Sequence, residues 1–141
     1  MPALKPPTAE EVAALGQKLE LRLPAAYVDA LIHYPFPLDS DLAEVVFFLD
    51  PRKVVEENEW RRKNGFFGHA WPKHFLIIGG MGNGDVIFLD TRRKAPSVLV
   101  ANHELSSGAA SLAVERWFGD ALLPEWLADV LEGWREARKL Q

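Results

Sequence analysis

Residues 79–85 read Gly-Gly-Met-Gly-Asn-Gly-Asp, a run whose glycines would let a backbone approach a phosphate closely. A dinucleotide-binding fingerprint leads from a strand into a helix, whose N-terminus meets the pyrophosphate. Here the following residues, 85–90 (DVIFLD), are typical of a strand, and no Lys-Ser/Thr pair follows the glycines as it would in a P-loop. The context therefore predicts a hairpin, with Asn83 and Gly84 as the central pair of a type I′ turn.

The four histidines are the chain's candidate metal ligands or acid–base groups: His33, His69, His74 and His103. Pro72 lies between His69 and His74 and prevents them from sharing one helical face. No HExxH or comparable spacing is present, and the chain has no cysteine to supply thiolate ligands. We therefore expect no metal and no cofactor. One enzymatic alternative stays open, in which His74, His103 and Glu104 form a metal-dependent or small-molecule site.

Nucleophilic and paired-carboxylate catalysis find little support in the sequence. No serine lies in a GxSxG elbow. Asp85 and Asp90 stand at opposite ends of a predicted strand, and their odd offset places them on opposite faces, which does not suit two carboxylates acting on one bond. We expect Asp85 to accept hydrogen bonds from the turn backbone and Asp90 to cap the turn into Thr91-Arg92. The sequence predicts no catalytic residue and no enzyme.

Charge is unevenly distributed along the chain, whose net charge is −4. Residues 29–59 carry eight acidic side chains against Arg52 and Lys53, whereas basic side chains dominate residues 60–98. The basic tracts at 61–63 and 92–94 are short and the pI is about 5.6, so they favour solvated helix ends and loops over nucleic-acid binding. The acidic segment, by contrast, suits a cationic partner.

The periodicity of apolar residues, together with capping and turn residues, predicts the helices and strands that position these residues. Thr8 and Glu11 form a capping box that opens a first helix, and Asp50 caps a charged helix whose Asn58 points inward while Arg61 points outward. We expect strands at four places, listed in chain order: 45–49 (VVFFL), 75–79, 85–90 and 97–102. We expect helices opened by Thr8, Pro24 and Asp50-Pro51, a helical stripe of Ala110, Ala113, Val114, Trp117 and Phe118, and a last helix from Pro124.

This order predicts an α+β fold, in which a mostly antiparallel sheet with a glycine-rich hairpin packs against N- and C-terminal helices. Residues 1–7 read as a flexible lead-in and residues 8–141 as a single domain, because this length and an apolar fraction of 48% suffice for one core. Residues 46–53 (VFFLDPRK) are similar to 86–94 (VIFLDTRRK), which we attribute to two Asp-led turns. The chain lacks cysteine, a membrane-length apolar run and an apolar leader, so we expect a cytoplasmic protein without a membrane partner.

Three stretches resemble the SUKH superfamily, which includes fungal cell-wall assembly regulators and bacterial toxin-immunity proteins. They are 23–31 (LPAAYVDAL), 71–79 (WPKHFLIIG) and 80–90 (GMGNGDVIFLD). Where the family's early helix usually runs into an NGG-like turn, this chain has 33–37 (HYPFP). The residues that carry the resemblance in the second and third stretches are Trp71, Pro72, Gly79, Gly80, Asn83, Gly84, Asp85 and Asp90.

The resemblance implies a protein-binding scaffold with no catalytic residues. In bacteria that role is often an immunity protein, which binds and neutralises a toxin encoded beside it, and a regulatory or scaffold module is the alternative. A nuclease toxin has a cationic cleft, so we expect the partner to contact the acidic segment and a neighbouring tryptophan. The expected contact residues are Asp39, Asp41, Glu44, Glu56, Glu57, Glu59 and Trp60. Trp71 is a second candidate anchor, and the sequence does not indicate an oligomeric state.

Overall fold

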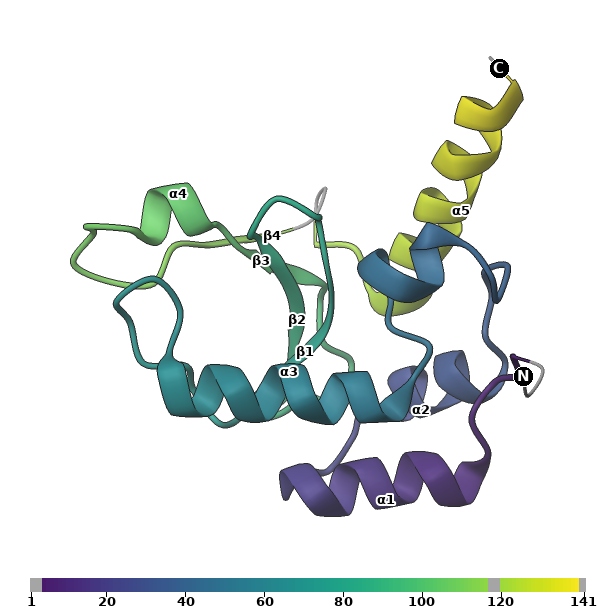
Figure 1. Ribbon diagram of the computed structural model, residues 1–141, viewed down its shortest axis with the longest axis horizontal. Coiled ribbons are helices and arrows are strands. Elements are labelled where there is room, and N and C mark those ends of the chain that lie inside the picture. Colours follow the sequence, from purple (N-terminus) through teal and green to yellow (C-terminus); the bar gives the residue numbers. More distant parts are fainter. Residues whose placement is uncertain (1–3, 117–119, 140–141) are drawn as a thin grey trace.

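The computed structural model describes residues 4–116 and 120–139 (Figure 1). This part of the chain contains four longer helices, a central pair of strands and four short elements. In order they are α1 (Ala9–Leu19), α2 (Ala25–Ile32), the π-helical turn η1 (Leu42–Val46), α3 (Pro51–Asn64), β1 (Phe75–Gly80), β2 (Val86–Asp90), β3 (Leu99–Ala101), α4 (His103–Ser106), β4 (Val114–Arg116) and α5 (Leu123–Lys139).

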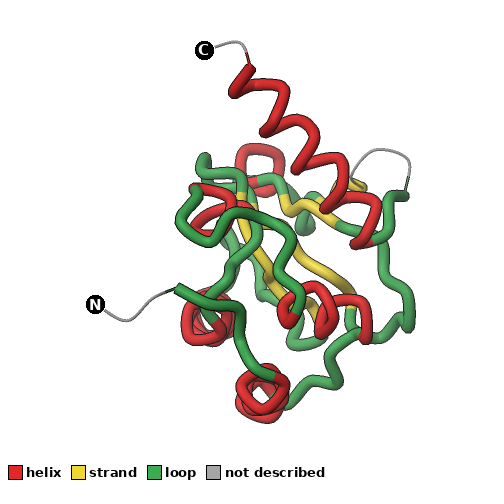
Figure 2. The backbone as a smooth tube through the Cα atoms, turned by 90° about the vertical axis from the view of Figure 1, so that its right-hand side faces the viewer, coloured by secondary structure: helices red, strands yellow, loops and turns green. Residues whose placement is uncertain are grey.

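The four strands form one sheet in the order β1-β2-β3-β4, and each neighbouring pair is antiparallel. Helix α3 packs against β1, and α1 packs against α3, so helices from the N-terminal half cover one side of the sheet (Figures 1 and 2). Helix α5 contacts α2 and then extends away from the body. The predicted α+β class, with an antiparallel sheet between N- and C-terminal helices, is confirmed.

Helices α1 and α3 begin at the capping residues that the sequence predicts. The Glu11 N–H donates to Thr8 Oγ1 at 3.2 Å and the Thr8 N–H donates to Glu11 Oε1 at 3.0 Å, which completes the capping box of α1. Asp50 Oδ1 accepts from the Arg52 N–H at 2.9 Å at the start of α3. Asn58 is buried on the inner face of α3 as predicted. The prediction that Arg61 points outward is wrong, because its side chain is half-buried against aromatic rings.

The predicted strand at 45–49 is wrong. Its first two residues end the π-helical turn η1, and residues 47–49 pair with the sheet only where the Phe48 N–H donates to Ile78 O at 2.9 Å. Phe47, Phe48 and Leu49 are all buried, which an alternating strand with one solvated face would not allow. Phe47 instead stands at the centre of an aromatic cluster with Tyr27, Tyr34, Phe36 and Trp126.

Residues 81–85 connect β1 to β2, but the predicted type I′ turn at Asn83-Gly84 is wrong. Positive φ angles occur at Gly82 (79°) and Gly84 (107°), and Asn83 has none, whereas a type I′ turn needs positive φ at both central residues. Asn83 uses its side chain instead: Oδ1 accepts from the Asp85 N–H at 3.0 Å. A five-residue connection replaces the two-residue turn, and its last residue, Asp85, accepts a hydrogen bond from the His103 N–H at the start of α4.

The segment after β3 also differs from the prediction. The predicted helical stripe from Ala110 is wrong, because residues 110–113 are not helical and Val114 begins β4. The short helix α4 precedes this stretch, and Asn102 caps it: Oδ1 accepts from the Leu105 N–H at 2.9 Å. Trp117 and Phe118 lie outside the described residues. Helix α5 begins at Leu123, one residue before the predicted start, and buries Trp126 and Leu127. None of the described helices is both long and apolar enough to span a bilayer.

Candidate protein-binding surface

Four large apolar side chains are exposed on consecutive segments near one end of the hairpin. They are Trp60 at the end of α3 (56% exposed), Phe67 in the following turn (42%), Met81 after β1 (42%) and Leu105 in α4 (58%). We call these four residues, of which Trp60 and Phe67 are aromatic, the aromatic rim. Trp60 belongs to the predicted contact set, and the other three were not predicted. Trp71, the second candidate anchor, is only 5% exposed and packs in the core.

Arg61 joins two members of the aromatic rim. Its guanidinium lies 4.9 Å from the Trp60 ring centroid, 4.9 Å from that of buried Phe66 and 5.9 Å from that of Phe67. Burial lowers the pKa of Arg61, opposed by the nearby Glu57 carboxylate. A guanidinium held between aromatic faces is already desolvated and oriented, which reduces the cost of contacting a partner.

Phe67 occupies a strained turn. The Phe66 N–H donates to His69 O at 2.7 Å and the His69 N–H donates to Phe66 O at 3.0 Å, so Phe67 and Gly68 are the two central residues of a tight hairpin turn. Their φ angles are 45° and 89°, the positive values that a type I′ turn requires. The sequence predicts this turn type at Asn83-Gly84, but the structure places it here, where a phenylalanine fills the first position.

Asp85 joins the β1–β2 connection to His103 at the start of α4, and the His103 ring lies beside the Phe67 ring of the turn. Asp85 Oδ1 accepts from the His103 N–H at 2.8 Å and from the His103 ring Nδ1. Burial alone would raise the pKa of Asp85, but these hydrogen bonds from His103 lower it. The His103 ring lies 5.5 Å from the Phe67 ring, and a Cβ on Gly84 would come within 3.0 Å of His103 Cγ. Asp85 therefore holds α4 in place, which corrects the prediction that it serves the turn backbone.

A pocket of about 220 Å³ lies between α3, η1 and the β1–β2 connection, beside the aromatic rim. Lys53, Glu57 and Arg61 reach it from α3, and Asp85 and the connection's glycines line its other side. These two cations and two carboxylates balance, so the pocket lining has no net charge. The pocket is smaller than the sites of drug-sized ligands, which are about 300 Å³ or more.

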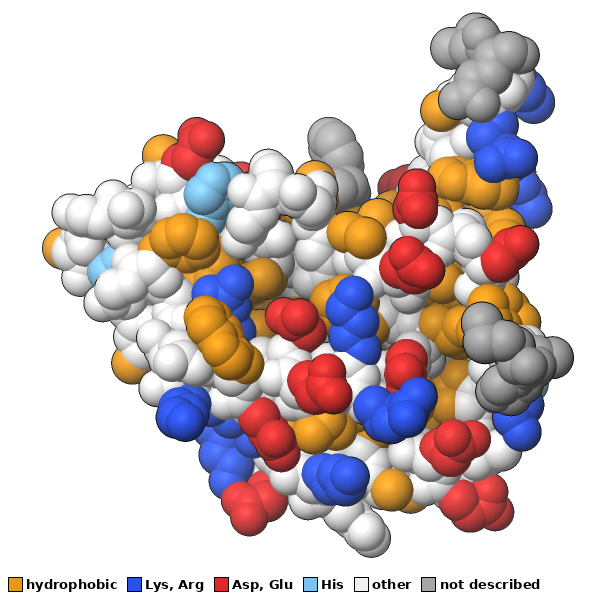
Figure 3. Space-filling view, viewed as in Figure 1, with side chains coloured by type: hydrophobic (Ala, Val, Ile, Leu, Met, Phe, Trp, Pro, Cys, Tyr) orange, Lys and Arg blue, Asp and Glu red, His pale blue; other side chains and the backbone are white. Residues whose placement is uncertain are grey.

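The predicted acidic residues surround this region without forming one continuous patch. Asp39, Asp41 and Glu44 are exposed before and within η1, and Glu56 and Glu59 are exposed on the outer face of α3. Figure 3 shows acidic and basic side chains interleaved over that face. Glu57 is the exception, because it turns toward the pocket beside the aromatic rim.

The histidines do not assemble the alternative enzymatic site. His74 lies beside Phe75, which pairs with Asp90 at one end of the hairpin, whereas His103 contacts Asp85 at the other end. Within residues 4–116 and 120–139, no group of three or more histidine, aspartate or glutamate side chains could hold a metal ion. His69 Nε2 lies 2.7 Å from Ser106 O, and exposed His33 lies 3.8 Å from Asp29.

The residues that carry the family resemblance have structural positions. Trp71 Nε1 donates to Phe75 O at 3.2 Å, and the Pro72 carbonyl accepts from the Phe75 N–H at 3.1 Å. A Cβ on Gly79 would lie 1.6 Å from Val46 O, so only glycine fits where η1 crosses β1, and Gly80 lies beside the same crossing. Asp90 Oδ1 accepts from the Arg92 N–H at 3.1 Å, as predicted, and the hydrogen bonds from Arg92 lower the pKa of Asp90.

Comparison with known families gives one match. The model of the SMI1/KNR4 family (SUKH-1) matches residues 6–115, which include α1 to α4 and the whole aromatic rim and end within β4. Neither a curated protein nor a solved structure matches the chain.

Proposed function

The chain belongs to the SMI1/KNR4 family (SUKH-1), and from that premise we propose that it is a non-enzymatic domain that binds another protein through the aromatic rim. The partner that we propose is a toxin, which makes the chain a cytosolic immunity protein. A regulatory or scaffold role in the manner of the fungal regulators is the second candidate, and it would use the same surface.

Phe67 carries the proposal. A non-glycine residue in the left-handed region costs about 1–2 kcal/mol, and glycine, asparagine or aspartate would occupy the turn with less strain. The Phe67 ring is also 42% exposed, so it stabilises the fold less than a buried ring would. Phe67 is thus unfavourable for stability in both its backbone conformation and its exposure, and its ring lies beside His103, which Asp85 holds. Such a residue suits a contact with a partner.

The residues near Phe67 are of the types that contribute most to binding at protein interfaces. Tryptophan, tyrosine and arginine are enriched among such residues, and the Arg61 guanidinium lies over both the Trp60 and the Phe67 rings. The predicted acidic residues belong to the periphery in this proposal. Asp39, Asp41, Glu44, Glu56, Glu57 and Glu59 attract a cationic partner over a distance and orient it.

Co-expression tests the immunity role. The product of the gene encoded next to this chain is expressed with the wild-type chain, with the Trp60→Ala, Phe67→Asn double variant, or with Leu4→Ala. Leu4 is a matched control, because it is 59% exposed and belongs to the N-terminal segment, on the opposite side of the molecule from α4 (Figure 1). We expect the wild type and Leu4→Ala to restore growth and the double variant to fail. Binding without any restored growth would favour the regulatory role, and no binding would contradict both.

A further inference from the structure

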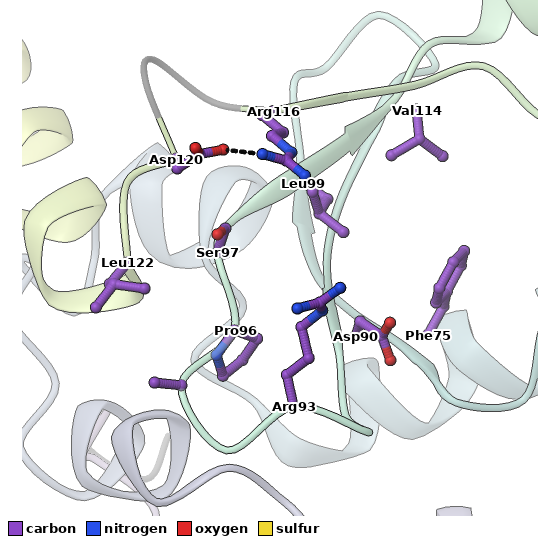
Figure 4. Close-up of a pocket in the computed structure, with 11 residues that line it drawn as sticks. Phe75, Asp90, Arg93, Pro96, Ser97, Leu99, Val114, Arg116, Asp120 and Leu122 are labelled. Atoms are coloured by element: carbon purple, nitrogen blue, oxygen red, sulfur yellow. Dashed lines mark hydrogen bonds and ion pairs between the residues drawn. The ribbon is translucent and has the colours of Figure 1, made fainter.

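A second pocket, of about 490 Å³, lies over one face of the sheet (Figure 4). The apolar side chains of Phe75, Leu99 and Val114 form its floor, one from each of β1, β3 and β4. The register explains why they share a face: Phe75 pairs with Asp90, and Leu99 pairs with Arg116, two residues from Val114. Phe75 is at the Asp90 end of the hairpin, whereas Val114 pairs with Ala101, whose other partner Val86 follows Asp85.

Most charges around this pocket are already neutralised. Asp90 receives the Arg92 guanidinium at 3.0 and 2.9 Å, and Arg116 Nη1 donates to Asp120 Oδ1 at 2.6 Å. Arg93 differs, because its guanidinium makes no hydrogen bond or ion pair with any residue that the structure describes. Figure 4 shows the Arg93 side chain extending into the pocket between Asp90 and Leu99.

We propose that this pocket binds a small molecule with an apolar body and a single carboxylate. The apolar body rests on Phe75, Leu99 and Val114, and the carboxylate meets Arg93, whose planar guanidinium matches a carboxylate with two parallel hydrogen bonds. A volume of about 490 Å³ lies within the range of small-molecule sites. Of the two arginines in the described pocket lining, Arg116 already has a carboxylate partner, so the remaining cation, Arg93, suits a monoanion better than a phosphate dianion.

Two matched probes test the proposal. Naphthalene-2-carboxylate and naphthalene-2-carboxamide have the same aromatic body and differ in charge, and their dissociation constants follow from calorimetric or NMR titration of the full chain. We expect the carboxylate to bind the wild type more tightly. In Arg93→Gln the carboxylate should lose about tenfold to a hundredfold in affinity while the carboxamide changes little. Lys94→Gln removes an exposed charge from the same loop, outside the pocket lining, and should change neither probe.

Val114→Glu supplies an independent test of location. Val114 is 41% exposed on a short strand, so the substitution should leave the fold intact, which circular dichroism verifies, while the new carboxylate repels the anionic probe from the pocket floor. Trp60→Ala, in the aromatic rim, should leave both probes unaffected, which separates this site from the protein-binding surface. The proposal is overturned if neither probe binds, if Arg93→Gln weakens both probes equally or neither, or if Val114→Glu leaves carboxylate binding unchanged.

Discussion

At the scale of single residues, Asn58 completes the hydrogen bonding of a strand from within a helix. Its side chain is fully buried, Nδ2 donates to Ile77 O at 2.9 Å and to Val54 O at 2.8 Å, and Oδ1 accepts from the Ile77 N–H at 2.7 Å. Ile77 lies in β1, which is an edge strand of the sheet and therefore pairs with a strand on one side only. Asn58 therefore satisfies backbone groups that would otherwise be buried without partners.

We expect Asn58→Ala to lower the free energy of unfolding by about 3 kcal/mol, because it leaves the N–H and the C=O of Ile77 unsatisfied and buried. Urea denaturation measures this loss. Asn64→Ala is the control, since Asn64 donates to Trp60 O at 2.9 Å on the exposed side of the same helix, and it should cost well under half as much. Equal losses in the two variants would show that the strand contact contributes nothing.

The two tyrosines predict a loss of stability at high pH. Burial raises the pKa of Tyr27, with Tyr34 adding to the shift, and burial raises the pKa of Tyr34. An unfolded tyrosine ionises near pH 10, so the stabilisation is complete below about pH 10 and is lost as the pH rises toward the folded pKa. For buried Tyr27 the slope is about 1.4 kcal/mol per pH unit. Denaturation at pH 9, 10 and 11 should show a stability that falls mainly above pH 10, more steeply for the wild type than for Tyr27→Phe.

Tyr27→Phe should be at least as stable as the wild type at pH 7, because the buried Tyr27 hydroxyl has no hydrogen-bond partner among the described residues. Tyr34→Phe serves as the comparison. The Tyr34 hydroxyl donates to Phe47 O, so its removal should cost about 1 kcal/mol. A substantial loss of stability in Tyr27→Phe would contradict the assignment of its hydroxyl as unpaired.

Residue roles were predictable where both partners are close in sequence. Asp50 with Arg52 and Asp90 with Arg92 make the same contacts, backbone N–H and guanidinium to one carboxylate, which explains the similarity between 46–53 and 86–94. Asp85 and His103 are 18 residues apart, and nothing local indicates their pairing. Phe67 had a local signal in the sequence 64–69 (NGFFGH), where two phenylalanines lie between glycines and only one can point inward.

At the scale of elements, the crossing of η1 over β1 fixes the glycine at position 79. We expect Gly79→Ala to destabilise the fold severely, by about 3 kcal/mol or more, because its Cβ would overlap the Val46 carbonyl in a packed interior. Gly133→Ala is the matched substitution in α5. There the added Cβ meets nothing within 4 Å, and helix propensity should raise stability by about 1 kcal/mol. Thermal unfolding compares the two, and similar effects would contradict the crossing.

Helices with capping residues were predictable as elements, and the segments around them were not. Thr8 and Asp50 each specify a helix start through a hydrogen bond that spans two or three residues. The run 45–49 has the β-branched and aromatic composition of a strand, but the aromatic cluster around Phe47 determines its conformation. The helical periodicity around Val114 was overridden by pairing with β3, a contact that forms only in the folded chain.

At the scale of the whole molecule, the described residues present two surfaces of different character, which share no residue. The aromatic rim exposes large side chains without a deep cavity, which suits a protein partner, whereas the pocket over Phe75, Leu99 and Val114 is concave and suits a small molecule. The acidic residues predicted from the sequence lie around the first surface and are interleaved with bases (Figure 3). The charge distribution and the family resemblance indicated a binding domain. The fold is needed to place Trp60 and Phe67 on either side of Arg61.

The central claim is that Phe67 serves binding at the expense of stability. The most direct test is the dissociation constant of the complex with the neighbouring gene's product, measured by calorimetry for the wild type, Phe67→Asn and Leu4→Ala. We expect Phe67→Asn to weaken binding by about thirtyfold, the effect of losing an interface anchor, while its free energy of unfolding stays equal or rises by up to about 1 kcal/mol. Leu4→Ala should bind as the wild type does. Unchanged affinity in Phe67→Asn, with the fold intact, would contradict the claim.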